Sequence, residues 1–225
     1  MPRIWAALRG SEGVMRRVAT RKELNRVLVF SGSYLAISSI SILRTQNYEF
    51  LLYLLVMTAI IIAVLGVHRR AGLSENLLWG FGLWGLFHMV GGLCSIPDSW
   101  HTADTTGVVY NWRIIPGYLK YDQLVHGYGS GLTTWLCWQA LAARTKSNDG
   151  SPIAPTLGML SLCATAGMGF GALNEVIEFF ASILIPTTNV GDYENTGWDL
   201  VANLVGATIA VLCIRSKWAY YKVDS

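Results

Sequence analysis

Three pairs of polar side chains occur at helical spacing inside long apolar stretches of this sequence. The pairs are Asp122 with His126, Glu175 with Glu178, and Asp199 with Asn203. Residues three or four positions apart lie on the same face of an α-helix. Charged side chains inside a membrane helix are costly by several kcal/mol and are typical of functional sites. We therefore take these six residues as the candidate site.

The residue types of this set support three chemical interpretations. Carboxylates and an imidazole are ligands of divalent cations, so a divalent metal is a candidate cofactor. The candidate metal ligands are His126, Glu175, Glu178 and Asp199. In the second interpretation, Glu175 and Glu178 form a general acid/base pair or a proton relay, because two carboxylates one turn apart in a low dielectric do not both stay ionised. In the third, the polar groups only join helices through hydrogen bonds.

No motif in the sequence indicates an organic cofactor. It contains no nucleotide-binding loop, no haem-attachment motif and no G-x-S-x-G nucleophile motif.

His88 is interpreted as a packing histidine rather than a ligand. Asp192 and Glu194 either shape an outer turn over the site or belong to a solvated turn.

The composition places the polar pairs in a membrane protein. Only 14% of the residues are charged and 52% are apolar, whereas about a quarter of a soluble domain is charged. A helix needs about 20 apolar residues to cross a bilayer core about 30 Å thick. We therefore predict an all-α, polytopic transmembrane helix bundle, with a single membrane domain of about six spans over residues 27–214. The predicted spans are 27–43, 51–67, 77–96, 122–142, 156–185 and 198–214.

Lys and Arg residues are distributed unequally between the two sides of this predicted bundle. The N-terminal tail 1–26, the C-terminal tail 215–225 and the loops after the second and fourth spans hold fourteen of the 17, and the other side holds three. The positive-inside rule then places both tails in the cytoplasm. The basic N-terminal tail indicates contact with the inner leaflet of the lipid bilayer, not with nucleic acid. In this orientation all three polar pairs lie in the outer half of the bilayer.

Small residues accompany the polar pairs. Gly127-x-x-x-Gly131 follows the first pair, Gly167-x-x-x-Gly171 precedes the second, and Gly206 lies one turn below the third. Small residues four positions apart let membrane helices approach closely. We therefore expect the last three spans to form one tight cluster around the polar site.

Three stretches, residues 121–126, 174–179 and 191–206, carry the patterns D-x-x-x-H, E-x-x-E and D-x-x-x-N-x-x-G in that order. In these patterns the chain resembles the YjdF-type predicted inner-membrane proteins and, more distantly, the VanZ-like membrane proteins. Glu178 stands where VanZ-like proteins often have Gln, which favours the YjdF-type branch. The resemblance implies a multi-pass protein of the cell (inner) membrane, whose biochemical activity is unassigned.

As the leading hypothesis, the acidic and histidine-containing site acts on an amphiphilic or lipid-linked substrate in the outer half of the bilayer. Glu175 or Glu178 would be the acid/base, with His126 and Asp199 as ligands or orienting groups. The alternatives are a proton-coupled small-molecule transporter and a non-catalytic structural or assembly subunit of a membrane complex. A transporter needs a polar path through the inner half, and the inner halves of the last three spans are almost wholly apolar. The sequence leaves open whether the protein is an enzyme, and whether it binds a membrane-protein partner or a second copy of itself.

Overall fold

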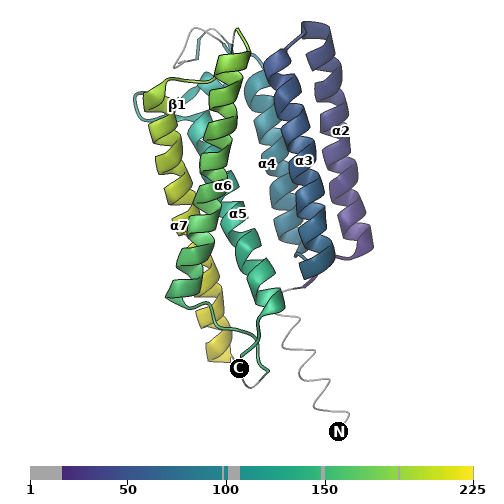
Figure 1. Cartoon of the computed structure of the whole chain (residues 1–225), viewed down its shortest axis with the longest axis vertical. Helices are drawn as coiled ribbons and strands as arrows, with labels where there is room; N and C mark the ends of the chain where they lie inside the picture. Colours follow the sequence, from purple (N-terminus) through teal and green to yellow (C-terminus); the bar gives the residue numbers. More distant parts are fainter. Residues whose placement is uncertain (1–16, 98, 101–106, 148–149, 187, 225) are drawn as a thin grey trace.

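The structure is a computed structural model that describes residues 17–97, 99–100, 107–147, 150–186 and 188–224. Side chains are described as far as Trp218, and residues 1–16 of the predicted basic tail lie outside the described part. Within that part, six α-helices run side by side as one bundle (Figure 1). They are α2 (Arg21–Thr45), α3 (Tyr48–Ala71), α4 (Glu75–Leu93), α5 (Tyr121–Arg144), α6 (Leu157–Leu184) and α7 (Tyr193–Asp224). The predicted all-α membrane helix bundle is confirmed.

Four of these helices are long and apolar enough to cross a membrane, namely α2, α3, α6 and α7 as far as Trp218. α4 and α5 run alongside them in Figure 1 without reaching that hydropathy. α4 is rich in glycine and tryptophan, and α5 carries polar residues along its buried face. These residue types lower the hydropathy of a helix that is covered by other helices rather than by lipid.

Most of the helices extend past the spans predicted from the sequence. α2 begins at Arg21 because Thr20 and Glu23 form a capping box, in which each side chain accepts a hydrogen bond from the backbone N–H of the other. α7 begins at Tyr193, where the Asp192 carboxylate accepts a hydrogen bond of 3.0 Å from the Asn195 N–H. Hydropathy marks the part of a helix that lies in hydrocarbon, whereas the capping residues mark where the helix starts.

The two ends of the bundle differ. α2 begins and α7 ends at the terminal end, which is lowest in Figure 1. The opposite end, the hairpin end, carries the α2–α3, α4–α5 and α6–α7 connections. The α4–α5 connection contains the 3-10 helix η1 (Val109–Asn111) and an antiparallel hairpin of β1 (Arg113–Ile115) and β2 (Leu119–Lys120). Because β2 leads directly into α5, the hairpin places Lys120 immediately before the first residue of that helix.

α5 packs directly against the backbones of α6 and α7. A Cβ atom added to Gly206 on α7 would lie 1.8 Å from the carbonyl oxygen of Gly127, and one added to Gly131 would lie 3.0 Å from the carbonyl oxygen of Gly206. A Cβ atom added to Gly167 on α6 would lie 2.9 Å from the carbonyl oxygen of Ser130. The close approach of the last three helices, predicted from their small residues, is therefore confirmed.

The outward faces of α6 and α7 are apolar. Large apolar side chains that are at least half exposed follow both helices along their length, including Phe179, Ile183, Leu204 and Ile209. An exposed apolar face of this extent suits contact with lipid rather than with water.

Candidate functional site

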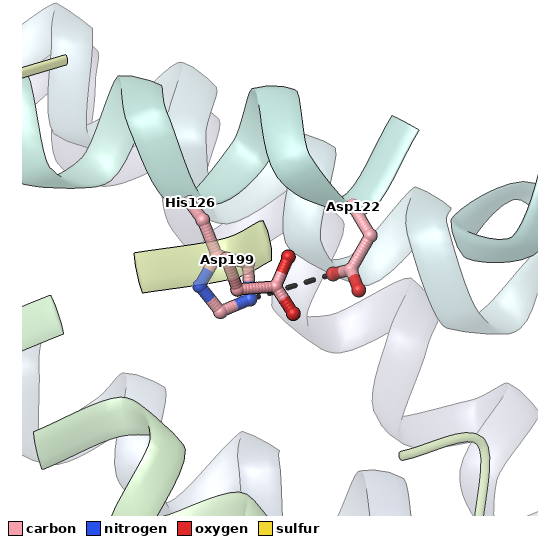
Figure 2. A group of neighbouring side chains, drawn as sticks. All are labelled: Asp122, His126 and Asp199. Atoms are coloured by element: carbon pink, nitrogen blue, oxygen red, sulfur yellow. Dashed lines mark ion pairs between the residues drawn. The ribbon is translucent and has the colours of Figure 1, made fainter. Parts of the chain in front are cut away.

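Three helices bring four carboxylates together around one imidazole. On α5, His126 Nε2 lies 3.4 Å from Asp122 Oδ1; from α6, Glu178 Oε1 lies 3.5 Å from the same nitrogen. His126 Nδ1 lies 3.1 Å from Glu175 Oε1, also on α6. Asp199 on α7 completes the group, and its side chain converges with those of Asp122 and His126 in Figure 2. We call these five residues the His126 cluster.

Two further polar residues hold the aspartates of the cluster. The Asn195 side-chain amide donates to Asp199 Oδ2 at 2.6 Å and to Asp122 Oδ2 at 3.4 Å. The Lys120 ammonium lies 3.4 Å from the same Asp122 oxygen and donates a hydrogen bond to Asn195 Oδ1. The Oδ2 atoms of both aspartates are therefore engaged by this network. Asp122 Oδ1 faces His126, and Asp199 Oδ1 has no hydrogen-bond partner among the described residues.

The two glutamates have different surroundings. Glu178 Oε1 accepts a hydrogen bond of 2.6 Å from the Asn174 side-chain amide, one turn earlier on α6. Neither oxygen of Glu175 accepts a directed hydrogen bond from the part of the chain that the structure describes, although Oε1 lies beside the imidazole. Buried polar atoms are usually hydrogen-bonded, so unpartnered carboxylate oxygens indicate a functional role or a missing ligand.

The cluster is buried but not sealed. Asp199 is fully buried, and the side chains of His126 and Glu175 are only 6% and 8% exposed. The side chains of Asp122 and Glu178 are 14% and 13% exposed, so these two are the less buried members of the cluster, and we call them its rim.

The cluster lies near the hairpin end of the bundle. Asp122 is the second residue of α5 and Asp199 is in the second turn of α7, while Glu178 is six residues before the end of α6. At 1.5 Å per residue, that places Glu178 about 9 Å from the end of its helix. All of these positions are at the end opposite the described C-terminus in Figure 1.

Asn203, the sixth predicted site residue, belongs to the neighbouring packing layer. It is one turn beyond Asp199 on α7 and is buried against Gly171 on α6, where an added Cβ atom would lie 2.5 Å from its Nδ2 atom. That Nδ2 atom has no hydrogen-bond partner in the described part of the chain. The structure therefore brings five of the six residues together in the His126 cluster and places the sixth in the layer beneath it.

The buried face of α5 continues from the cluster as a stripe of polar residues. Ser130 and Thr134 follow Asp122 and His126 at intervals of four, and both are buried. The Thr134 hydroxyl donates to the Ser130 carbonyl oxygen, and Gly167 closes over both residues. The next buried polar side chain on α5, Gln139, bonds Ser74 near the terminal end instead. The stripe thus ends at Thr134, about 18 Å along the helix from Asp122 at 1.5 Å per residue.

Lys120, Asn195 and Asn174 were not among the residues predicted from the sequence. Asn174 precedes Glu175 directly, and Asn195 is four residues before Asp199, a spacing that could have indicated it. Lys120 lies in β2, outside the helices, so helical spacing could not indicate it. Its ammonium reaches Asp122 because the hairpin leads directly into α5. Asp192, directly before α7, caps that helix, and Glu194, the second residue of α7, is exposed.

Two further buried polar groups lie beside the cluster without joining it. Glu49, at the start of α3, accepts three hydrogen bonds of 3.0 to 3.1 Å from the backbone and side chain of Asn189. His88 on α4 is hydrogen-bonded through Nδ1 to the Tyr110 hydroxyl and is surrounded by aromatic rings, which fits its interpretation as a packing histidine. Both groups have protein hydrogen-bond partners, in contrast to the two oxygens of Glu175 and to Asp199 Oδ1.

The cluster contains two overlapping groups that could hold a metal ion. In one, Asp122, His126 and Asp199 offer ligand atoms that all lie within 4.8 Å of one another, and in the other His126, Glu175 and Glu178 do so. An imidazole with carboxylates is a donor set suited to divalent transition metals. Without a metal, the same carboxylates can share protons and act as general acids and bases.

Comparison with known proteins places the chain in one family. Residues 26–218 match a family model described as "Predicted membrane protein (DUF2238)". The match includes all six helices through Trp218 except the first turn of α2, and it therefore contains the whole His126 cluster. No match was found among proteins of curated function or among solved structures.

Proposed function

Because the chain belongs to the DUF2238 family of predicted membrane proteins, we propose that the His126 cluster is the working site of a multi-pass membrane protein that acts on an amphiphilic or lipid-linked substrate. The observation that carries this proposal is the convergence of five ionisable side chains from three helices at one level of the bundle. Structural hydrogen bonding explains satisfied groups such as Glu49, but it does not explain carboxylate oxygens that are left without donors.

The orientation in the membrane is part of the proposal. The excess of Lys and Arg at the terminal end supports cytoplasmic termini in the cell (inner) membrane, which puts the hairpin end and the cluster in the outer half of the bilayer. At that depth, a lipid headgroup would reach the rim of Asp122 and Glu178 while its acyl chains lie along the apolar faces of α6 and α7.

The relationship to YjdF-type and VanZ-like proteins is also part of the proposal. The residues that carry the resemblance to YjdF-type and VanZ-like proteins include Asp122, His126, Glu175, Glu178 and Asp199. Five residues from three separated motifs meet around one imidazole, which supports the view that these motifs form one common site.

The roles of the site residues follow from their surroundings. Glu178 is the accessible glutamate next to the imidazole, so we assign it the general acid/base role. His126 and Asp199 hold and orient the reacting groups. The polar stripe of α5 ends at Thr134, and this favours a site that works from one side over a proton-coupled transporter, which needs a path from the cluster to the terminal end.

The test is reconstitution of purified protein into vesicles made from the polar lipids of the expression host, followed by mass spectrometry of the lipids. Wild-type protein and the exposed-carboxylate control Glu194→Gln are expected to change the amount of at least one lipid species. His126→Ala and Glu178→Gln, folded as judged by gel filtration, are expected to leave the lipids as in protein-free vesicles. Identical lipid profiles with wild-type protein and His126→Ala would contradict the proposal. Dissipation of a pH gradient by wild-type protein in the same vesicles would favour the transporter instead.

A further inference from the structure

The formal charges of the His126 cluster do not balance. Four carboxylates, those of Asp122, Glu175, Glu178 and Asp199, gather around one imidazole, and among the described residues one ammonium, that of Lys120, pairs with Asp122. Even with a protonated imidazole, two negative charges are in excess. Uncompensated charge is strongly disfavoured in a buried site within a membrane bundle. A cation, or protons on the carboxylates, must therefore complete the site.

The directions of the hydrogen bonds favour a cation over protons. Asn195 and Lys120 engage the Oδ2 atoms of Asp122 and Asp199. The Oδ1 atom of Asp122 is left facing His126 Nε2, and the Oδ1 atom of Asp199 is left without a partner among the described residues. A proton on Asp199 Oδ1 would be a buried donor that also needs an acceptor, whereas a metal ion would be ligated by both Oδ1 atoms and Nε2 together.

The second ring nitrogen of His126, Nδ1, lies beside Glu175. Histidines that bind a metal through one ring nitrogen usually donate the other N–H to a carboxylate or a carbonyl group, which fixes the tautomer and the ring orientation. Here Glu175 Oε1 lies 3.1 Å from His126 Nδ1. Glu175 thus lies beside Nδ1 as an ion-pair contact, without a directed hydrogen bond, while Nε2 faces Asp122 and, at 3.5 Å, Glu178.

We propose that the His126 cluster binds one divalent transition-metal ion of the Zn²⁺ or Mn²⁺ kind through His126 Nε2, Asp122 Oδ1 and Asp199 Oδ1. Glu175 is the positioning residue behind the imidazole, and Glu178 stands at the open side of the ion. The inference rests on the proposed function, since it names the cofactor of that same site. Three protein ligands leave positions for water or for substrate, as in catalytic metal sites. An imidazole ligand favours these ions over Ca²⁺ or Mg²⁺, which prefer oxygen ligands alone.

The experiment measures metal directly. Protein purified in detergent, with any affinity tag removed, is analysed by inductively coupled plasma mass spectrometry, and chelator-treated protein is then titrated with ZnCl₂, MnCl₂ or MgCl₂ while its melting temperature is recorded. Wild-type protein is expected to carry stoichiometric metal and to be stabilised by Zn²⁺ or Mn²⁺ but not by Mg²⁺. His126→Ala and Asp199→Asn are expected to lose the metal, and Glu175→Gln to bind it about 10- to 100-fold more weakly.

Glu49→Gln is the matched control, because Glu49 is a buried carboxylate close to the cluster whose oxygens already accept hydrogen bonds from Asn189. It is expected to keep the metal. Wild-type protein that carries no metal and is not stabilised by any of the ions would overturn the inference, whatever the variants do. Lipid conversion by metal-free, chelator-treated wild-type protein would also overturn it and would leave the proposed function standing. Metal binding without any lipid conversion would support the metal site and overturn the proposed function.

Discussion

Replacement of Gly206 by alanine tests how closely the helices around the site approach each other. An added Cβ atom would lie 1.8 Å from the carbonyl oxygen of Gly127 and 2.6 Å from its carbonyl carbon, and both of these are backbone atoms that no rotamer change can move. Contacts of a Cβ atom under 3.0 Å essentially never occur, so α7 and α5 must separate locally by about 1.2 Å. Asp199 lies two turns away on the same helix, and its position relative to His126 would shift with it.

The expected loss of stability follows from two opposing contributions. Overpacking in a close-packed interior costs about 1–3 kcal/mol, and the backbone contact puts this substitution at the upper end. Alanine is favoured over glycine in a helix by up to about 1 kcal/mol. The net loss is therefore about 2 kcal/mol, which corresponds to a melting temperature lower by roughly 4–8 °C for a chain of this size.

Thermal unfolding in detergent, followed by size-exclusion chromatography of the protein that remains folded, measures this difference. Gly197→Ala is the matched control, because Gly197 is also on α7 and an added Cβ atom there meets nothing within 4 Å. The control is expected to melt at or slightly above the wild-type temperature. Equal melting temperatures for Gly206→Ala and Gly197→Ala would refute the reasoning, since they would mean that α5 and α7 do not pack with their backbones in contact.

Three further predictions follow, two on the surroundings of the site and one on the orientation in the membrane. Lys120→Met removes an ammonium 3.4 Å from Asp122 Oδ2, and this positive charge would repel a bound cation. We therefore expect the metal-depleted variant to bind Zn²⁺ or Mn²⁺ more tightly than wild-type protein in a titration. Weaker binding would mean that Lys120 supports the ion instead of competing with it. Glu49→Ala leaves the N–H groups of Asn189 without their acceptor, so we expect a loss of about 1–3 kcal/mol, seen as a lower melting temperature with unchanged metal content; loss of the metal would place Glu49 in the site. A green fluorescent protein fused to the C-terminus is expected to be fluorescent in cells, because the positive-inside rule predicts that this end is cytoplasmic. If that fusion is not fluorescent, and an alkaline phosphatase fused at the same position is active, the orientation is the reverse.

The sequence was sufficient to predict the six helices and the close packing of the last three. Apolar runs located all six, and the intervals of three and four identified the faces that carry Asp122, His126 and Glu175. The small residues around Gly127 and Gly206 predicted that those faces lie close together. These signals are local, because they depend on the period of a single helix.

The groups that complete the site could not be predicted in this way. Lys120 reaches Asp122 only because a hairpin turns the chain back into α5, and a loop lysine carries no periodic signal. Glu49 and Asn189 are 140 residues apart, and their pairing depends on how α3 and the α6–α7 connection lie in space. Asn203 had the right spacing to join the cluster. Its side chain instead packs against Gly171 in the layer beneath the imidazole.

X-ray absorption spectroscopy at the metal edge of protein isolated from membranes tests the central claim most directly. The account predicts a Zn or Mn signal whose ligands are one imidazole nitrogen and several oxygens, at about 2.0–2.2 Å in the case of zinc, and which disappears in His126→Ala but not in Glu49→Gln. No metal above background in the wild-type protein, or a spectrum dominated by sulfur ligands, would contradict it.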